Sequence, residues 1–147
     1  MRVLKRFVQL SAAERRILSR VFLVVGVARA SLWLSPLEKA RRLVARAAIG
    51  AAGDSVEQVV WAVRAASRYL PGATCLTQAM AAQALLTQAG FPSQIEIGFA
   101  KGQDQDEDDG ALRHFRAHAW VVCYGQVVLG GQPGARYNSL VVWGQQE

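Results

Sequence analysis

Two side chains of this sequence could carry out acyl-transfer chemistry, the thiol of Cys75 and the imidazole of His118. A thiol attacks an acyl carbon well only as a thiolate, and a neighbouring imidazole can accept its proton and later return it to a leaving amine. Cys75 follows the chain break at Pro71-Gly72 and opens an alanine-rich stretch, whereas His118 stands near the head of an alternating stretch. Nucleophile and base would then come from a helix start and from a strand.

The residues around Cys75 predict a helix from Cys75 to about Ala89. Thr74 can cap it, and Gly90 can end it. In the first turn of a helix, the dipole and the unpaired N–H groups favour a thiolate over a thiol. The backbone N–H of Cys75 could also stabilise the oxyanion that forms during attack.

Three further helices are expected before Cys75, at about residues 10–34, 36–48 and 55–69. Ser11 and Glu14 form the pattern of a capping box for the first of them. Pro36 is well placed in the first turn of the second, and Asp54 or Ser55 can cap the third.

Downstream of Phe91-Pro92 the apolar period changes from helical to alternating, which predicts strands. We expect strands at about residues 94–99, 115–122 and 139–143, in one antiparallel sheet. Alternation places His118, Trp120 and Val122 on one face. Cys123 then faces the other way, with Ala117, Ala119 and Val121, and is expected to be a small turn or core residue.

The segment Cys123-Tyr124-Gly125 can form a three-residue hairpin loop with Gly125 in the left-handed conformation. This loop predicts a register in which Val122 pairs with Gln126 and Trp120 with Val128. His118 would then lie opposite Gly130.

Size and composition predict a single domain over residues 1–147, with a helical part at 1–70 and a helix plus sheet at 71–147. The chain has 147 residues, of which 52% are hydrophobic, and this is enough to bury a core without metal or disulfide support. Two cysteines are too few for a disulfide framework, and no secretory signal is visible at the N-terminus. These features favour the cytoplasm.

The net charge of +6 is concentrated at the N-terminus, where residues 1–48 hold eleven Lys or Arg against Glu14 and Glu38. Such a segment could favour nucleic acid, an anionic membrane surface or an acidic partner. Solvated faces of amphipathic helices are the ordinary explanation, and no base-reading motif supports nucleic acid. The apolar run Val21–Ala28, between Arg20 and Arg29, is short for a transmembrane span, which needs roughly 20 apolar residues.

No metal or cofactor is expected. The acidic loop at residues 104–109 loosely resembles a calcium loop but lacks the glycine and the terminal glutamate of such a loop. Two cysteines and two histidines without paired spacing do not make a structural zinc site. His114 is read as a surface residue at the end of this loop.

Several motifs together resemble a known family. They are Cys75-Leu76 at the start of the helix, Ala89-Gly90-Phe91-Pro92, Glu96-Ile97-Gly98-Phe99, and Arg116-Ala117-His118-Ala119-Trp120-Val121 followed by Val127-Val128-Leu129. This set resembles the lasso-peptide biosynthesis B protein in its separate leader-peptidase form, a transglutaminase-like cysteine protease. The resemblance implies an α+β fold of the transglutaminase and papain type, with a nucleophile helix packed on a small antiparallel sheet and preceded by N-terminal helices.

The same resemblance implies a function. The enzyme would remove the leader from a ribosomally made precursor peptide, with Cys75 as nucleophile and His118 as base, and a separate cyclase would close the freed core. A separate small protein would capture the leader, and the basic, apolar N-terminal helices offer a docking surface for it.

One position departs from the family pattern. The aspartate that usually completes the triad is replaced here by Gly130, and no aspartate follows His118. The imidazole could be oriented instead by the Gly130 carbonyl, Gln132, Asn138 or Glu96. Two other functions therefore stay open: a noncatalytic binding or scaffold protein of the same fold, and an acyl transferase that passes the thioester to an amine.

Overall fold

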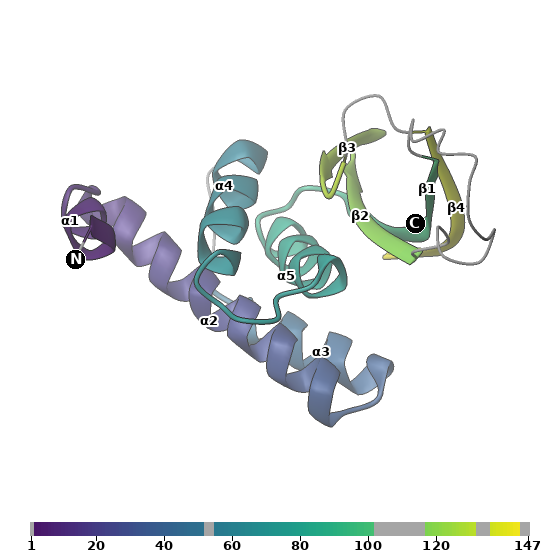
Figure 1. Cartoon of the computed structure of the whole chain (residues 1–147), viewed down its shortest axis with the longest axis horizontal. Helices are drawn as coiled ribbons and strands as arrows, with labels where there is room; N and C mark the ends of the chain where they lie inside the picture. The colour runs from purple at the N-terminus through teal and green to yellow at the C-terminus, as the bar shows by residue number, and fades with distance from the viewer. Residues whose placement is uncertain (1, 52–54, 102–116, 132–135, 145–147) are drawn as a thin grey trace, which may run out of the picture.

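The computed structural model describes residues 2–51, 55–101, 117–131 and 136–144. In chain order the elements are α1 (Arg2–Val8), α2 (Ala12–Leu34), α3 (Leu37–Ala47), α4 (Val56–Ser67), α5 (Cys75–Gln88), β1 (Ser93–Lys101), β2 (Ala117–Cys123), β3 (Gln126–Leu129) and β4 (Arg136–Trp143). The helices lie on one side and the sheet on the other, with α5 between the remaining helices and the strands (Figure 1). The expected α+β fold is confirmed. The short helix α1 has no counterpart among the expected elements.

Helices α2 and α4 begin where the capping residues predict, whereas Pro36, expected in the first turn of α3, is its N-cap residue and makes no side-chain hydrogen bond. Ser11 and Glu14 form a complete capping box at α2, in which the side chain of each accepts a hydrogen bond from the backbone of the other. Ser55, rather than Asp54, caps α4 by accepting from the Gln58 N–H at 3.1 Å. Each cap satisfies an N–H group that the helix itself cannot pair.

Helix α5 is the centre of the core. It packs against α2, α3 and α4 on one side and against β1 and β2 on the other. Because it has neighbours all round, nearly all of its middle is buried: Ala79, Met80, Ala81, Ala82, Ala84, Leu85 and Leu86. The many alanines let these neighbours approach closely.

Helix α2 confirms the helix expected at about residues 10–34, and its apolar character extends beyond the run Val21–Ala28. By length and composition alone it could cross a membrane, as a buried core helix of a soluble protein also can. One of its faces belongs to the core through Ile17, Val21, Val24, Val25 and Ala28. The opposite face leaves large apolar side chains exposed, including Trp33 at 78%.

The described strands form one antiparallel sheet in the order β3-β2-β1-β4. Ile95 pairs with Val121 and Ile97 with Ala119, and these residues face the helical core. Glu96 pairs with Trp120 and Gly98 with His118, so these four share the other face. The expected division of both strands into faces is confirmed.

The hairpin between β2 and β3 differs from the expected three-residue loop. Cys123 pairs with Gln126, so the loop consists of Tyr124 and Gly125, at φ 50° and 75°. Positive φ at both loop positions gives a hairpin turn whose twist matches the flanking strands. Tyr124 is an unusual residue for this conformation, and this is why the sequence favoured Gly125 alone.

A bulge follows the turn and sets the rest of the register. Val122 pairs with Val127, whereas Val121 pairs with Leu129, and this leaves Val128 as the extra residue. The expected pairs of Val122 with Gln126 and of Trp120 with Val128 are therefore wrong. Gly130 lies against the backbone of Ala119 and Trp120 and not directly opposite His118.

Candidate active site

Cys75 is the first residue of α5, as expected. Thr74 has extended backbone and caps the helix by accepting from the Thr77 N–H at 3.3 Å, and the two threonine hydroxyls lie 3.1 Å apart. Cys75 is half-buried and packs against the hydrophobic core. Its own N–H lies in the first turn, where the helix makes no internal bond to it. The thiol and this N–H are therefore at the positive end of the helix dipole.

The turn that precedes Cys75 packs against an arginine that sequence reasoning missed. Arg29 of α2 donates from Nε to the Pro71 carbonyl at 3.4 Å. Gly72 has φ +76°, and a Cβ there would lie 2.7 Å from the Arg29 Nε. The positive φ favours glycine at position 72, whereas the flexible end of the Arg29 side chain could move away from a Cβ. No local pattern could link Arg29 to a turn 42 residues away in sequence.

His118 is bonded to the backbone of the next strand. Its Nε2 lies 2.7 Å from the carbonyl oxygen of Gly130. A carbonyl can only accept, so the Nε2 must carry the proton and donate it. The neutral ring then has its lone pair on Nδ1, and this nitrogen is available to act as a base.

Gly130 occupies a position that excludes a side chain. Its φ is +80°, and a Cβ would lie 2.7 Å from the carbonyl oxygen of Ala119 and close to the Trp120 backbone. An aspartate can adopt a left-handed conformation, but its Cβ could not make this approach to the Ala119 carbonyl without movement of the strand. The main-chain carbonyl of Gly130 contacts the imidazole at the position where the sequence resemblance led us to expect a carboxylate.

Glu96, another candidate partner of His118, is engaged by other side chains. One carboxylate oxygen accepts from Trp120 Nε1 at 3.0 Å and the other from Gln94 Nε2 at 2.8 Å. Trp120 is fully buried, and its ring stacks with that of His118 at 6.4 Å between centroids and 27° between planes. Among the described residues, Glu96 makes no hydrogen bond to His118, and Trp120 connects the two side chains. Of the other candidates, Gln132 lies outside the described residues, and Asn138 is described only as the backbone partner of Phe99.

The two catalytic candidates sit on elements that pack together, since α5 contacts β2. Between the two side chains, both of which the structure describes, there is no hydrogen bond. His118 and Trp120 lie on one face of the sheet. Ala119 and Val121 lie on the opposite face, which packs against the helical core that Cys75 also contacts. Catalytic hydrogen bonds are often long or unformed before substrate binds. The imidazole is held by Gly130 and not by the thiol.

Cys123 does not belong to this site. It is 3% exposed, and burial raises the pKa of its thiol. It stands on the face opposite to that of His118, as alternation predicted. His114 and the acidic segment 104–109 lie outside the described residues.

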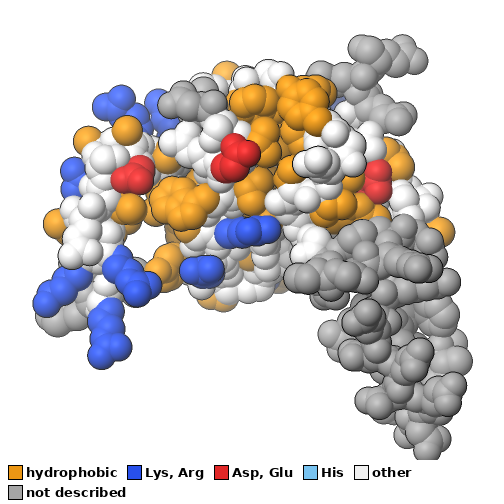
Figure 2. Space-filling view, turned by 90° about the horizontal axis from the view of Figure 1, so that it is seen from above, with side chains coloured by type: hydrophobic (Ala, Val, Ile, Leu, Met, Phe, Trp, Pro, Cys, Tyr) orange, Lys and Arg blue, Asp and Glu red, His pale blue; other side chains and the backbone are white. Residues whose placement is uncertain are grey.

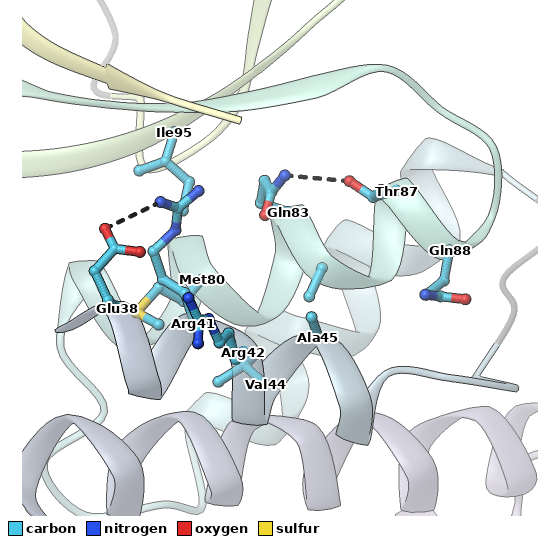
Figure 3. A pocket seen from close by; sticks show the side chains of 11 residues that line it. Glu38, Arg41, Arg42, Val44, Ala45, Met80, Gln83, Thr87, Gln88 and Ile95 are labelled. Atoms are coloured by element: carbon cyan, nitrogen blue, oxygen red, sulfur yellow. Dashed lines mark hydrogen bonds and ion pairs between the residues drawn. The ribbon is translucent and has the colours of Figure 1, made fainter. Parts of the chain in front are cut away.

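A cavity of about 350 Å³ lies on the far half of α5, between α3 and β1 (Figure 3). Arg41 and Glu38 form an ion pair of 3.7 Å at its rim, and Gln83 donates to Thr87 at 3.2 Å inside it. Neither Cys75 nor His118 lines it. Among the residues that the structure describes, no three metal-ligating side chains come together.

Comparison with known families assigns the chain to a superfamily. A model of the transglutaminase-like superfamily matches residues 19–142. No curated protein and no solved structure matches the chain. The superfamily includes cysteine peptidases, and its fold is compatible with cysteine protease or acyltransferase chemistry. Since the match extends from α2 into β4 and contains both Cys75 and His118, the chain belongs to the transglutaminase-like superfamily.

Proposed function

We propose that this protein is a cysteine-type leader peptidase, which cleaves the leader from a lasso-peptide precursor in the cytoplasm. The observation that carries the proposal is the hydrogen bond from His118 Nε2 to the Gly130 carbonyl. It orients the ring and selects the neutral tautomer whose lone pair is on Nδ1, the nitrogen that a general base would use. The motif set around Cys75 and His118 supports the choice of substrate.

The proposed reaction has two steps. The first step requires that substrate binding bring the imidazole within hydrogen-bond reach of the thiol, to which it is not hydrogen-bonded in the described structure. His118 Nδ1 then takes the thiol proton while Cys75 Sγ attacks the carbonyl carbon of the scissile peptide bond. The Cys75 N–H stabilises the resulting oxyanion, the C–N bond breaks, and Nδ1 returns the proton to the leaving amine of the core peptide. Water, deprotonated by the same nitrogen, then attacks the thioester and releases the leader as a free acid.

A neutral carbonyl is a weaker partner for an imidazolium than a carboxylate would be. The thiolate–imidazolium pair is therefore less stabilised than in a triad that contains an aspartate. We expect slower turnover as a result, and a need for precise delivery of the substrate. A separate leader-recognition protein would supply that delivery, and a separate cyclase would take up the freed core.

The test combines the purified protein, a precursor peptide and a recognition protein from the same pathway, with products identified by mass spectrometry. Cys75→Ala should abolish cleavage, whereas Cys123→Ala is the matched control and should retain it. Undiminished cleavage by Cys75→Ala would overturn the proposal. If the native protein cleaves nothing and Cys75 reacts with no thiol-directed peptide probe, a noncatalytic scaffold is the better description.

The same experiment separates hydrolysis from acyl transfer, which the superfamily fold also accommodates. The outcome depends on whether water or an amine reaches the thioester. A leader that ends in a free acid indicates a peptidase. A leader joined to an added amine indicates a transferase.

A further inference from the structure

A second groove lies between α4 and β3 and has a volume of about 450 Å³. Val60 and Trp61 of α4 and Val128 of β3 supply its apolar surface. Helix α4 and strand β3 lie at the top of the molecule in Figure 1, and Figure 2 shows the molecule from that side. Hydrophobic side chains fill the middle of this face, with Lys and Arg side chains beside them. The groove is separate from the cavity of Figure 3, which is lined by α3, α5 and β1.

The charges of the groove favour an acidic occupant. Arg64 and Arg68 line it one and two turns beyond Trp61, and Glu57 lies one turn before it. Within the described part of the chain, the ion pair present is that of Arg41 with Glu38, and neither Arg64 nor Arg68 takes part in one. Trp61 is 41% exposed, so its ring is available to an apolar side chain. An occupant that alternates carboxylates with apolar groups would satisfy both sets of contacts.

The wall formed by β3 can bind an extended backbone. This strand is at the edge of the sheet, and in the described residues it pairs only with β2. An edge strand presents unpaired N–H and C=O groups, to which a peptide can add as a further strand. Alternate side chains of such a peptide would point into the groove.

One wall of the groove belongs to the strand that precedes Gly130. Val128 lines it, and two residues further along the chain the Gly130 carbonyl holds His118 Nε2. A peptide that adds to β3 would therefore run from Trp61 and the arginines toward Gly130, whose carbonyl holds the catalytic candidate.

We infer that this groove binds an extended segment of the substrate peptide that carries acidic and apolar side chains next to the scissile bond. The identity of the occupant as a substrate rests on the proposed peptidase function. Its binding step can be measured without catalysis.

Binding is measured by fluorescence anisotropy on the full-length Cys75→Ala variant. The probe is a short labelled peptide in which glutamate alternates with leucine, and a peptide with lysine in place of glutamate serves for comparison. We expect the glutamate peptide to bind more tightly, with an affinity that falls as salt rises. Arg64→Glu, and separately Trp61→Ala, should each weaken binding by about tenfold.

Two matched controls guard against general effects. Arg46→Glu reverses a charge in the last turn of α3, as Arg64→Glu does in α4, so both variants disturb a helix C-terminus alike. Trp33→Ala removes an exposed tryptophan that does not line the groove. Both controls should bind the peptide like the parent. Equal binding by groove and control variants, or equal binding of both peptides, would overturn the inference.

Cleavage assays with Cys75 intact keep the two proposals apart. Groove variants should raise KM for the precursor with little change in kcat, because they remove contacts made equally in the ground and transition states. If these variants cleave with unchanged KM while Cys75→Ala is inactive, the groove inference fails and the peptidase stands. If the native protein cleaves nothing but peptide binding still depends on Trp61 and the arginines, the peptidase fails and the groove is a binding site.

Discussion

The imidazole of His118 donates from Nε2 to the main-chain carbonyl of Gly130 across 2.7 Å. A main-chain carbonyl cannot change its position by rotating a side chain. The position of the imidazole therefore depends on the backbone conformation of the residues that follow Leu129. In the usual triad a carboxylate performs this role and can be removed by one substitution. Here the acceptor can be moved only by changing the backbone.

Gly130→Ala should therefore disturb both stability and catalysis. The left-handed conformation costs a residue with a Cβ about 1–2 kcal/mol, and the contact with the Ala119 carbonyl adds to this. Because the strand must shift, we expect cleavage to fall by about a hundredfold, the loss typical of a misplaced catalytic group. Denaturant unfolding and cleavage rates measure the two effects.

Gly125→Ala is the matched control for this substitution. Gly125 has a similar φ of +75°, but nothing lies within 4 Å of its Cβ position. It should lose stability through backbone strain alone and keep its activity. Equal effects of the two substitutions would mean that contact with Ala119 is unimportant and that His118 does not depend on Gly130.

The faces of the sheet and the starts of the helices were predictable because local rules determine them. Alternation assigned His118 and Cys123 to opposite faces, and the side chains of Ser11 and Thr74 cap the helices they were expected to cap. These features depend on neighbours within four residues. The sequence thus contained enough information to find the helix start at Cys75 and the strand of His118.

The hairpin register was not predictable, because two irregular features combine there. Tyr124 takes a left-handed conformation that its residue type disfavours, and the bulge at Val128 has no sequence signature. The contact of Arg29 with Pro71 is equally hidden, since it joins segments far apart in the chain. At position 130 the sequence lacks the expected carboxylate, and the structure gives the reason: a Cβ at Gly130 would lie too close to the Ala119 carbonyl.

Trp120 and Glu96 should be energetically coupled. Trp120→Phe removes the indole N–H and leaves one oxygen of the half-buried carboxylate without this donor. A lost hydrogen bond to a charged group of this kind costs about 1–3 kcal/mol. Once Glu96→Gln has removed the charge, Trp120→Phe should cost less, so a double-mutant cycle by denaturant unfolding should give a nonzero coupling energy. Strictly additive losses would contradict the contact.

Thr74→Ala should weaken the helix start that presents Cys75. The substitution removes the acceptor for the Thr77 N–H and the hydroxyl that contacts Thr77, whose side chain is buried. Loss of such a cap costs about 0.5–2 kcal/mol. Thr74→Ser keeps the hydroxyl and should retain most of the stability. If both variants unfold at the same denaturant concentration as the parent, the cap does not hold α5.

The capping box of α2 predicts an acid-sensitive contribution to stability. The Ser11 backbone N–H, followed by the Ser11 hydroxyl, lowers the pKa of Glu14 below its usual value. Because the pKa of Glu14 is lowered in the folded protein, its carboxylate contributes to stability at pH values above the pKa of the unfolded carboxyl. This contribution is lost as pH falls through the folded-state pKa. Glu14→Gln should therefore unfold more easily than the parent near neutral pH and similarly in strong acid. A difference that does not shrink on acidification would contradict this assignment.

The two cysteines should differ in reactivity, and the difference should depend on folding. Cys75 is half-buried at a helix start, whereas Cys123 is 3% exposed with a pKa that burial raises. An alkylating reagent should label Cys75 in the folded protein and reach Cys123 only after denaturation, as peptide mapping would show. Because the pKa of Cys123 is raised in the folded protein, the neutral thiol contributes to stability at pH values below the pKa of the unfolded thiol. This contribution is lost as pH rises through the folded-state pKa. The parent should therefore lose stability on passing to alkaline pH more steeply than Cys123→Ala does. Labelling of Cys123 in the folded state at the rate of Cys75 would contradict its burial and would reopen the choice of nucleophile.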